Sequence, residues 1–83
     1  MKTIRTVIAD RLQDHGLWPK EAEAVMDAVE AVPENESMKG RWGDTPDGYP
    51  PSIMALMWMS AKTKAVEWID ANKPLHFARM MFL

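Results

Sequence analysis

The chain has 83 residues, of which 47% are hydrophobic and 27% charged, with a net charge of −2. This composition is typical of one folded domain, which we place over residues 1–83, and it excludes an intrinsically disordered chain. The absence of cysteine excludes disulfides, thiolate metal sites and a cysteine nucleophile, and the slightly negative charge excludes a general affinity for nucleic acid or anionic lipid.

The N-terminus does not resemble an export signal. Its basic start is followed at once by Asp10 and Asp14 instead of an apolar run. The longest nearly uncharged apolar stretch, residues 53–61, is far shorter than the roughly 20 residues that span a bilayer. Since a chain without cysteine also suits a reducing compartment, we expect a cytoplasmic protein with no membrane partner.

Residues 4–14 are predicted to form the first helix. Its apolar positions follow the helical repeat and comprise Ile4, Val7, Ile8 and Leu12. Thr3 suits the N-cap. His15 falls in the last turn, and Gly16 suits the left-handed position that ends a helix, followed by Leu17 as its hydrophobic contact.

A second helix is predicted to begin at Pro19, because proline is tolerated at the first helical position. Its apolar face consists of Ala22, Val25, Met26, Val29 and Val32. Pro33 prevents the helix from continuing far. The two helices are joined by only a few residues, which predicts an antiparallel αα-hairpin.

Residues 34–51 are predicted to form a long ordered loop, because neither a helical nor a strand period survives there. Residues 45–48, with the sequence Thr-Pro-Asp-Gly, are typical of a β-turn. The segment 44–48 faintly resembles a calcium loop, but the alternating ligands and the closing glutamate are missing. We therefore interpret it as a turn.

The third helix is predicted to run from Pro51 or Ser52 to about Ala71, with Asn72 as its C-cap and Pro74 as its stop. Its first half lacks a polar face, which predicts that protein surrounds it on most sides. Its second half is amphipathic. The inward positions are Ala61, Ala65, Trp68 and Ile69, and the outward ones are Lys62, Lys64, Glu67 and Asp70. We also assign Trp58 to the core.

The tail after Pro74, residues 75–83, is too apolar to remain free in water. It either packs on the core or docks on a partner. The chain also contains eight methionines, concentrated toward the C-terminal half. Methionine fills irregular cores and adaptable binding surfaces alike, so homo-oligomerisation through the third helix or the tail is an open alternative.

No residue pattern indicates catalysis. His15 and His76 are the only histidines, and they do not form a metal-binding pair. The sequence has no glycine-rich phosphate loop and no serine in a nucleophile elbow. We therefore expect no enzyme activity, no catalytic residue, no metal and no cofactor.

The second helix carries an acidic face. Glu23, Asp27, Glu30 and Glu34 are spaced by four, three and four residues, which places successive carboxylates about 5 to 6 Å apart along the axis. This is close to the separation of phosphates on a nucleic-acid strand, so the face could engage a target protein with a basic, nucleic-acid-binding surface. The simpler interpretation is the solvated side of an amphipathic helix.

The loop supplies a second set of candidate binding residues. Trp42, Tyr49 and Arg41 belong to the residue types most enriched at binding hot spots. With Lys39 they could also stack on single-stranded nucleic acid. The negative net charge counts against direct nucleic-acid binding, so we interpret them as anchors for a partner protein.

The C-terminal half, over about residues 40–83, contains a distinctive series of segments: Arg41-Trp42-Gly43-Asp44, Gly48-Tyr49-Pro50, Ala55-Leu56-Met57-Trp58, Ala65-Val66-Glu67-Trp68-Ile69-Asp70-Ala71-Asn72, Pro74 and His76-Phe77-Ala78-Arg79-Met80-Met81-Phe82. In these segments the chain resembles small uncharacterised proteins encoded by tailed bacteriophages and prophages. The resemblance transfers no catalytic residue. It implies the cytoplasm of a bacterial host and an early protein that acts on a host protein, including inhibitors of host enzymes and anti-defence proteins such as anti-CRISPRs.

These observations predict an all-α domain in which the αα-hairpin packs against a long central third helix, with an ordered loop and a docked tail. The predicted function is that of a phage-encoded, non-enzymatic protein that binds and inhibits or redirects a host cytosolic protein. The alternative is a homo-oligomeric structural, assembly or replication-accessory protein of the phage.

Overall fold

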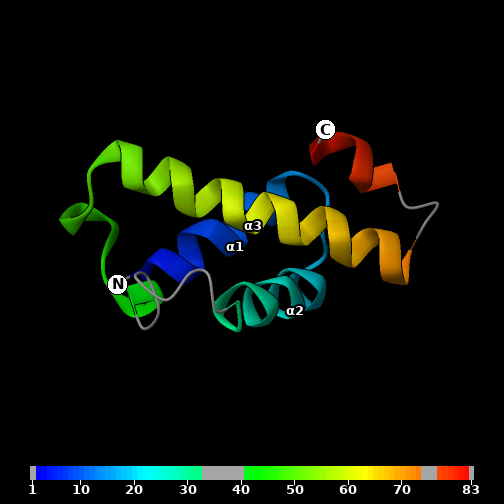
Figure 1. Cartoon of the computed structure of the whole chain (residues 1–83), viewed down its shortest axis with the longest axis horizontal. Coiled ribbons are helices and arrows are strands. Elements are labelled where there is room, and N and C mark those ends of the chain that lie inside the picture. The colour runs from blue at the N-terminus through cyan, green and yellow to red at the C-terminus, as the bar shows by residue number, and fades with distance from the viewer. Residues whose placement is uncertain (1, 33–40, 74–76, 83) are drawn as a thin grey trace.

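The structure, a computed structural model, describes residues 2–32, 41–73 and 77–82. It contains three α-helices, α1 (Ile4–Asp14), α2 (Pro19–Glu30) and α3 (Pro51–Asn72). Helices α1 and α2 form an antiparallel hairpin that packs against the longer α3 (Figure 1). The described residues include no strand. The predicted all-α, three-helix architecture is therefore confirmed.

Both ends of α1 form as the sequence predicts. The Thr3 hydroxyl accepts a hydrogen bond from the Thr6 amide at 3.2 Å, which caps the first turn. At the other end Gly16 adopts a φ of 110°, which favours glycine because it has no Cβ. The Leu17 amide then donates to the Leu12 carbonyl at 3.2 Å, and the Leu17 side chain is buried. This closure turns the chain back toward α2.

Helix α2 begins at Pro19, as predicted, and the Glu21 carboxylate accepts a hydrogen bond from the Trp18 amide at 2.9 Å. The buried positions of its apolar face are Ala22, Val25, Met26 and Val29. Val32 was predicted on the same face, but the helix ends at Glu30 and Val32 follows it, half-buried. The predicted stop, Pro33, lies outside the described residues.

Helix α3 extends one residue beyond the prediction, so Lys73 and not Asn72 occupies the C-cap. Its second half has the predicted amphipathic pattern, with a buried stripe of Met57, Ala61, Ala65 and Ile69. The prediction for its first half is wrong, because Leu56 and Met59 are 55% and 57% exposed. At 1.5 Å per residue α3 is about 33 Å long and the two hairpin helices only about 16 to 18 Å, so they cover one side of it.

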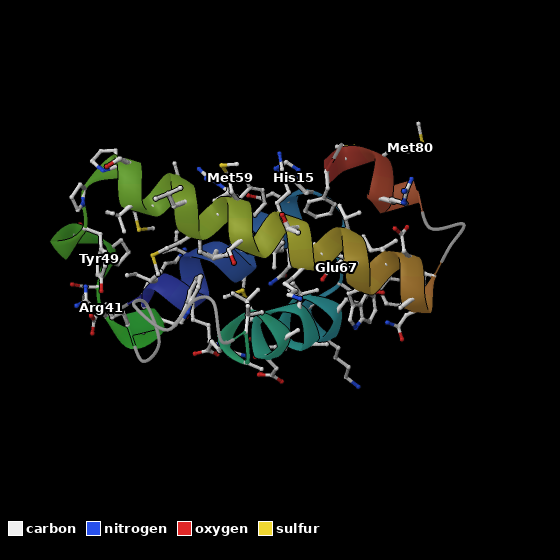
Figure 2. The ribbon with its side chains drawn as sticks, viewed as in Figure 1. His15, Arg41, Tyr49, Met59, Glu67 and Met80 are labelled. Carbon is white, nitrogen blue, oxygen red and sulfur yellow. The ribbon has the colours of Figure 1, made fainter. Side chains whose placement is uncertain are left out.

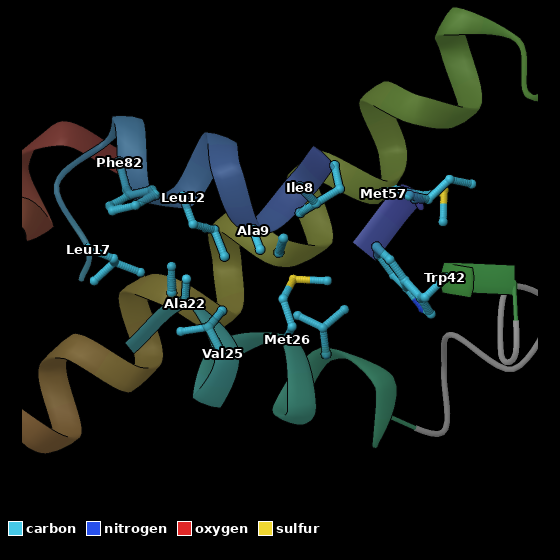
Figure 3. Close-up of a cluster of buried hydrophobic side chains, with 14 of the residues drawn as sticks. Ile8, Ala9, Leu12, Leu17, Ala22, Val25, Met26, Trp42, Met57 and Phe82 are labelled. Carbon is cyan, nitrogen blue, oxygen red and sulfur yellow. The ribbon is translucent and has the colours of Figure 1, made fainter. Parts of the chain in front are cut away.

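The core lies between the three helices and is closed at each end by an aromatic side chain (Figure 3). Trp42, from the short 3₁₀ helix η2 (Arg41–Gly43), is buried against it at the loop end. Trp58 and Trp68 pack on its edge and are only half-buried, so the prediction for them is confirmed in part. The predicted loop is thus anchored through its tryptophan.

The tail packs on the core. Of the two alternatives that the sequence left open, packing on the core and docking on a partner, the structure has the first. Residues Phe77–Phe82 form a 3₁₀ helix, η4, beside α3 (Figure 1). The buried Phe82 ring lies 5.1 Å from the His15 ring and 6.3 Å from the Trp58 ring, measured between centroids. The His15 Nδ1 atom lies 2.9 Å from the Met81 carbonyl oxygen. His15 therefore holds the tail against α1, a role that its sequence position did not indicate.

Candidate functional site

The acidic face of α2 is held by a cation from α1. The Arg5 Nη2 atom lies 2.8 Å from Glu23 Oε2 and 2.8 Å from Asp27 Oδ1, and its Nη1 atom pairs with Glu30. The predicted alignment of Glu23, Asp27 and Glu30 on one face is therefore confirmed. Glu34 lies outside the described residues. One guanidinium thus links three successive turns of α2 to α1.

The Arg5 cluster retains negative charge toward solvent. Three carboxylates surround one guanidinium, and the side chains of Glu23 and Asp27 are 63% and 75% exposed against 24% for Arg5. Burial lowers the pKa of Arg5, but the hydrogen bonds that Arg5 donates to Glu23 and Asp27 and the nearby negative charge of Glu30 outweigh it and raise the pKa overall. The guanidinium therefore stays charged, and the acidic face presents ordered carboxylates.

The structure separates the three loop residues that the sequence grouped as anchors. Trp42 is 1% exposed and belongs to the core, so its predicted role as an exposed anchor or a stacking platform is wrong. Its large ring covers the core at the end of the short hairpin. Among the described residues no other aromatic side chain is fully buried there. Arg41 is exposed and Tyr49 is half-buried. Lys39 lies outside the described residues.

Arg41 and Tyr49 lie at the rim of an open groove of about 1070 Å³ between the loop and the first turns of α3. They project from the loop at the same end of the molecule (Figure 2). The residues that α3 contributes to the groove lining, Ile53 and Leu56, are apolar. Sequence reasoning assigned this part of α3 to the interior, so it missed the groove.

Asp44 fixes the geometry of the groove. Its carboxylate accepts a hydrogen bond from the Tyr49 hydroxyl at 2.9 Å. Its backbone carbonyl accepts one from the Ile4 amide at 2.8 Å, which ties the loop to the start of α1. Partial burial of the ring and the hydrogen bond to Asp44 raise the pKa of Tyr49, while Arg41 opposes the shift. The phenol therefore stays protonated and keeps donating to Asp44 at neutral pH.

The segment 45–48 forms the turn that the sequence predicted. The Gly48 amide donates to the Thr45 carbonyl at 3.3 Å, and residues Pro46–Gly48 form the 3₁₀ helix η3. Across the described ranges, no group of three or more histidine or acidic side chains is placed so that it could hold a metal ion. In the same ranges no helix has both the length and the apolar character needed to cross a membrane.

Two further surface features lie outside the acidic face and the groove. The exposed Trp18 ring lies under the Lys73 ammonium, which is 4.8 Å from the ring centroid and also pairs with Glu21. Met80 and Met81 are 72% and 59% exposed on η4. The first feature joins the start of α2 to the end of α3 and is structural. The second leaves methionine side chains on the surface.

No protein-family model matches this chain, and no curated protein or solved structure matches it at a significant level. The resemblance of residues 40–83 to small phage-encoded proteins stays a prediction. Among the described residues, three surfaces are therefore candidates for function: the Arg5-linked acidic face, the groove at the loop end, and the exposed methionines.

Proposed function

We propose that this chain is a phage-encoded, non-enzymatic protein that binds a cytosolic protein of the bacterial host and inhibits or redirects it. The observation that carries the proposal is the acidic face, where exposed carboxylates are held in place on α2 by Arg5. A fixed array of like charges suits a basic, nucleic-acid-binding surface, because its side chains lose little freedom on binding. Host takeover and anti-defence activity are the settings that the phage resemblance implies.

The test is capture of a partner from bacterial lysate followed by affinity measurement with charge variants. Glu23→Gln combined with Asp27→Asn neutralises the two most exposed carboxylates of the face. We expect this double variant to bind the captured partner more weakly and with a flatter salt dependence. The matched control is Asp14→Asn combined with Glu67→Gln, which removes two exposed carboxylates elsewhere.

The control should bind like the unmodified chain. Glu30 is left unchanged because it is the least exposed of the three acids and its pairing with Arg5 contributes to the hairpin. If the first double variant binds with unchanged affinity at both low and high salt, the electrostatic proposal is wrong. Circular dichroism of each variant verifies that helicity is retained.

A second candidate function is a homo-oligomeric structural, assembly or replication-accessory protein. The observation in its favour is the exposure of Met59, Met80 and Met81, each more than half accessible. Large apolar side chains in this state mark interaction surfaces when they gather into a patch. Light scattering on the purified chain separates the candidates. A defined oligomer that Met59→Glu dissociates, with no stoichiometric host partner, would replace the inhibitor proposal.

A further inference from the structure

The groove at the loop end combines one cation with an apolar wall. Arg41 is exposed at its rim and forms no ion pair with any residue in the described part of the chain. The α3 side of the groove presents Leu56, which is 55% exposed, and the half-buried Ile53. Tyr49 and Asp44 are engaged with each other by the 2.9 Å hydrogen bond. Arg41 also hydrogen-bonds to the Tyr49 hydroxyl. This contact uses only part of the guanidinium, so its other N–H donors and the aliphatic wall remain available to a ligand.

We propose that this groove binds a segment of the partner protein in which an aliphatic side chain lies beside a carboxylate. The inference rests on the proposed function, because it names the chemistry of the partner that the groove accepts. The aliphatic group packs on Leu56 and Ile53, and the carboxylate pairs with Arg41, whose planar guanidinium matches a carboxylate in a two-point contact. The positive charge of Arg41 favours a negatively charged ligand group.

Asp44 places a negative charge in the same groove, so it provides an independent test of the proposed ligand charge. It orients the Tyr49 ring through its hydrogen bond, and at the same time it repels an incoming carboxylate. Asp44→Asn retains a side-chain oxygen that can accept the hydrogen bond from the Tyr49 hydroxyl, and it removes the negative charge. This variant should therefore bind the acidic segment more tightly than the unmodified chain, an effect that a merely structural role for Asp44 would not produce.

The experiment is a titration of the full, isotope-labelled chain with three blocked hexapeptides, followed by amide chemical shifts. One peptide has two central leucines flanked by glutamates, one has the same leucines flanked by lysines, and one has serines flanked by glutamates. We expect only the first to shift the amides of Tyr49, Ile53 and Leu56 strongly. Arg41→Glu should weaken it about threefold to tenfold and favour the lysine peptide instead.

Lys20→Glu is the matched charge reversal, because Lys20 is exposed on α2 outside the groove lining. It should leave the affinity for the glutamate peptide unchanged. Leu56→Ser should weaken that peptide about threefold to tenfold through the lost apolar contact. Both groove residues are exposed, so their variants should fold, which thermal unfolding verifies.

The proposal is overturned if the three peptides bind equally, if the lysine peptide binds best, or if the shifts lie outside the groove. Its failure is distinct from failure of the proposed function. A captured host partner that is insensitive to Arg41→Glu and Leu56→Ser refutes the groove assignment alone. Selective peptide binding with no host partner refutes the host-inhibitor function alone.

Discussion

The two ends of the helical bundle are closed in different ways. At the tail end, the rings of Phe82, His15 and Trp58 pack against one another, and η4 lies beside α3 (Figure 1). At the loop end, Trp42 is buried against the core, and an open groove lies between the loop and the first turns of α3. The first end retains a groove of about 270 Å³ beside Phe82, whereas the groove at the second end is about 1070 Å³ and offers more space to another molecule. The loop end is therefore the better place to look for a partner.

The largest expected effect is on Trp42, the anchor of the loop end. Trp42→Ala should lower the free energy of unfolding by about 3 to 5 kcal/mol, since it empties the space of a fully buried indole. Domains typically have a total stability of about 5 to 15 kcal/mol, so this is a large part of it. Denaturant unfolding monitored by circular dichroism measures the loss.

Trp42→Phe is the matched control for that cavity. It keeps an aromatic ring and removes an indole N–H that has no hydrogen-bond partner in the described part of the structure. Its cost should therefore be clearly smaller. If Trp42→Ala costs less than about 1 kcal/mol, Trp42 does not close the core and the contrast between the two ends fails.

Phe82→Ala should have the next largest effect, because Phe82 is buried at the tail end. A terminal segment can detach without unfolding the helices, so the loss should be less than the about 3 to 5 kcal/mol of a central phenylalanine. Hydrogen exchange should show lost protection in η4 and little change in α2. Met80→Ala, at a position that is 72% exposed, is the control and should change little. Global unfolding by Phe82→Ala would mean that the tail is integral to the core.

Arg5→Ala should have a moderate effect, because it removes the cation that joins α1 to three carboxylates on α2. We expect a loss of about 1 kcal/mol in the free energy of unfolding, larger at low salt where the remaining carboxylates repel each other more strongly. Arg5→Lys should recover part of it, since it restores the charge without the guanidinium fork. An equal loss at low and high salt would argue against an electrostatic role.

How far the sequence predicts the structure depends on whether the controlling interaction is local. The start and stop of α1 follow from Thr3 and Gly16, and the start of α2 follows from Pro19, because capping is decided within a few residues. The exposure of Leu56 does not follow, because it depends on how far the hairpin reaches along α3. An apolar run alone cannot reveal which of its residues a shorter neighbour covers.

The candidate site follows the same division. The alignment of Glu23, Asp27 and Glu30 can be predicted from helical spacing. Their pairing with the Arg5 guanidinium cannot be predicted in this way. Arg5 comes from another helix, so pairing it with them requires the register of the hairpin. Trp42 was predicted at the surface because it lies in a loop rich in polar and turn residues. Only the assembled fold shows that the open end of the core lies beneath that loop.

The smallest expected effect concerns Tyr49, at the groove. The raised pKa means that the folded chain keeps the phenolic proton over a pH range in which the unfolded chain has lost it. The resulting stabilisation is fully present below the unfolded pKa of about 10 and is lost as the pH rises through the folded pKa. The chain contains one tyrosine, so phenolate absorbance reports on Tyr49 alone. Asp44→Asn should lower this pKa toward its ordinary value, because it removes the negative charge beside the phenol.

Tyr49→Phe provides the matching stability control. This variant lacks the titrating phenol. The difference in free energy of unfolding between Tyr49→Phe and the unmodified chain should therefore be constant below a pH of about 10 and change with pH above it. A pKa that Asp44→Asn leaves unchanged would mean that partial burial alone shifts it. The 2.9 Å hydrogen bond would then not control the ring, and the groove would lose the fixed wall on which the contrast with the tail end depends.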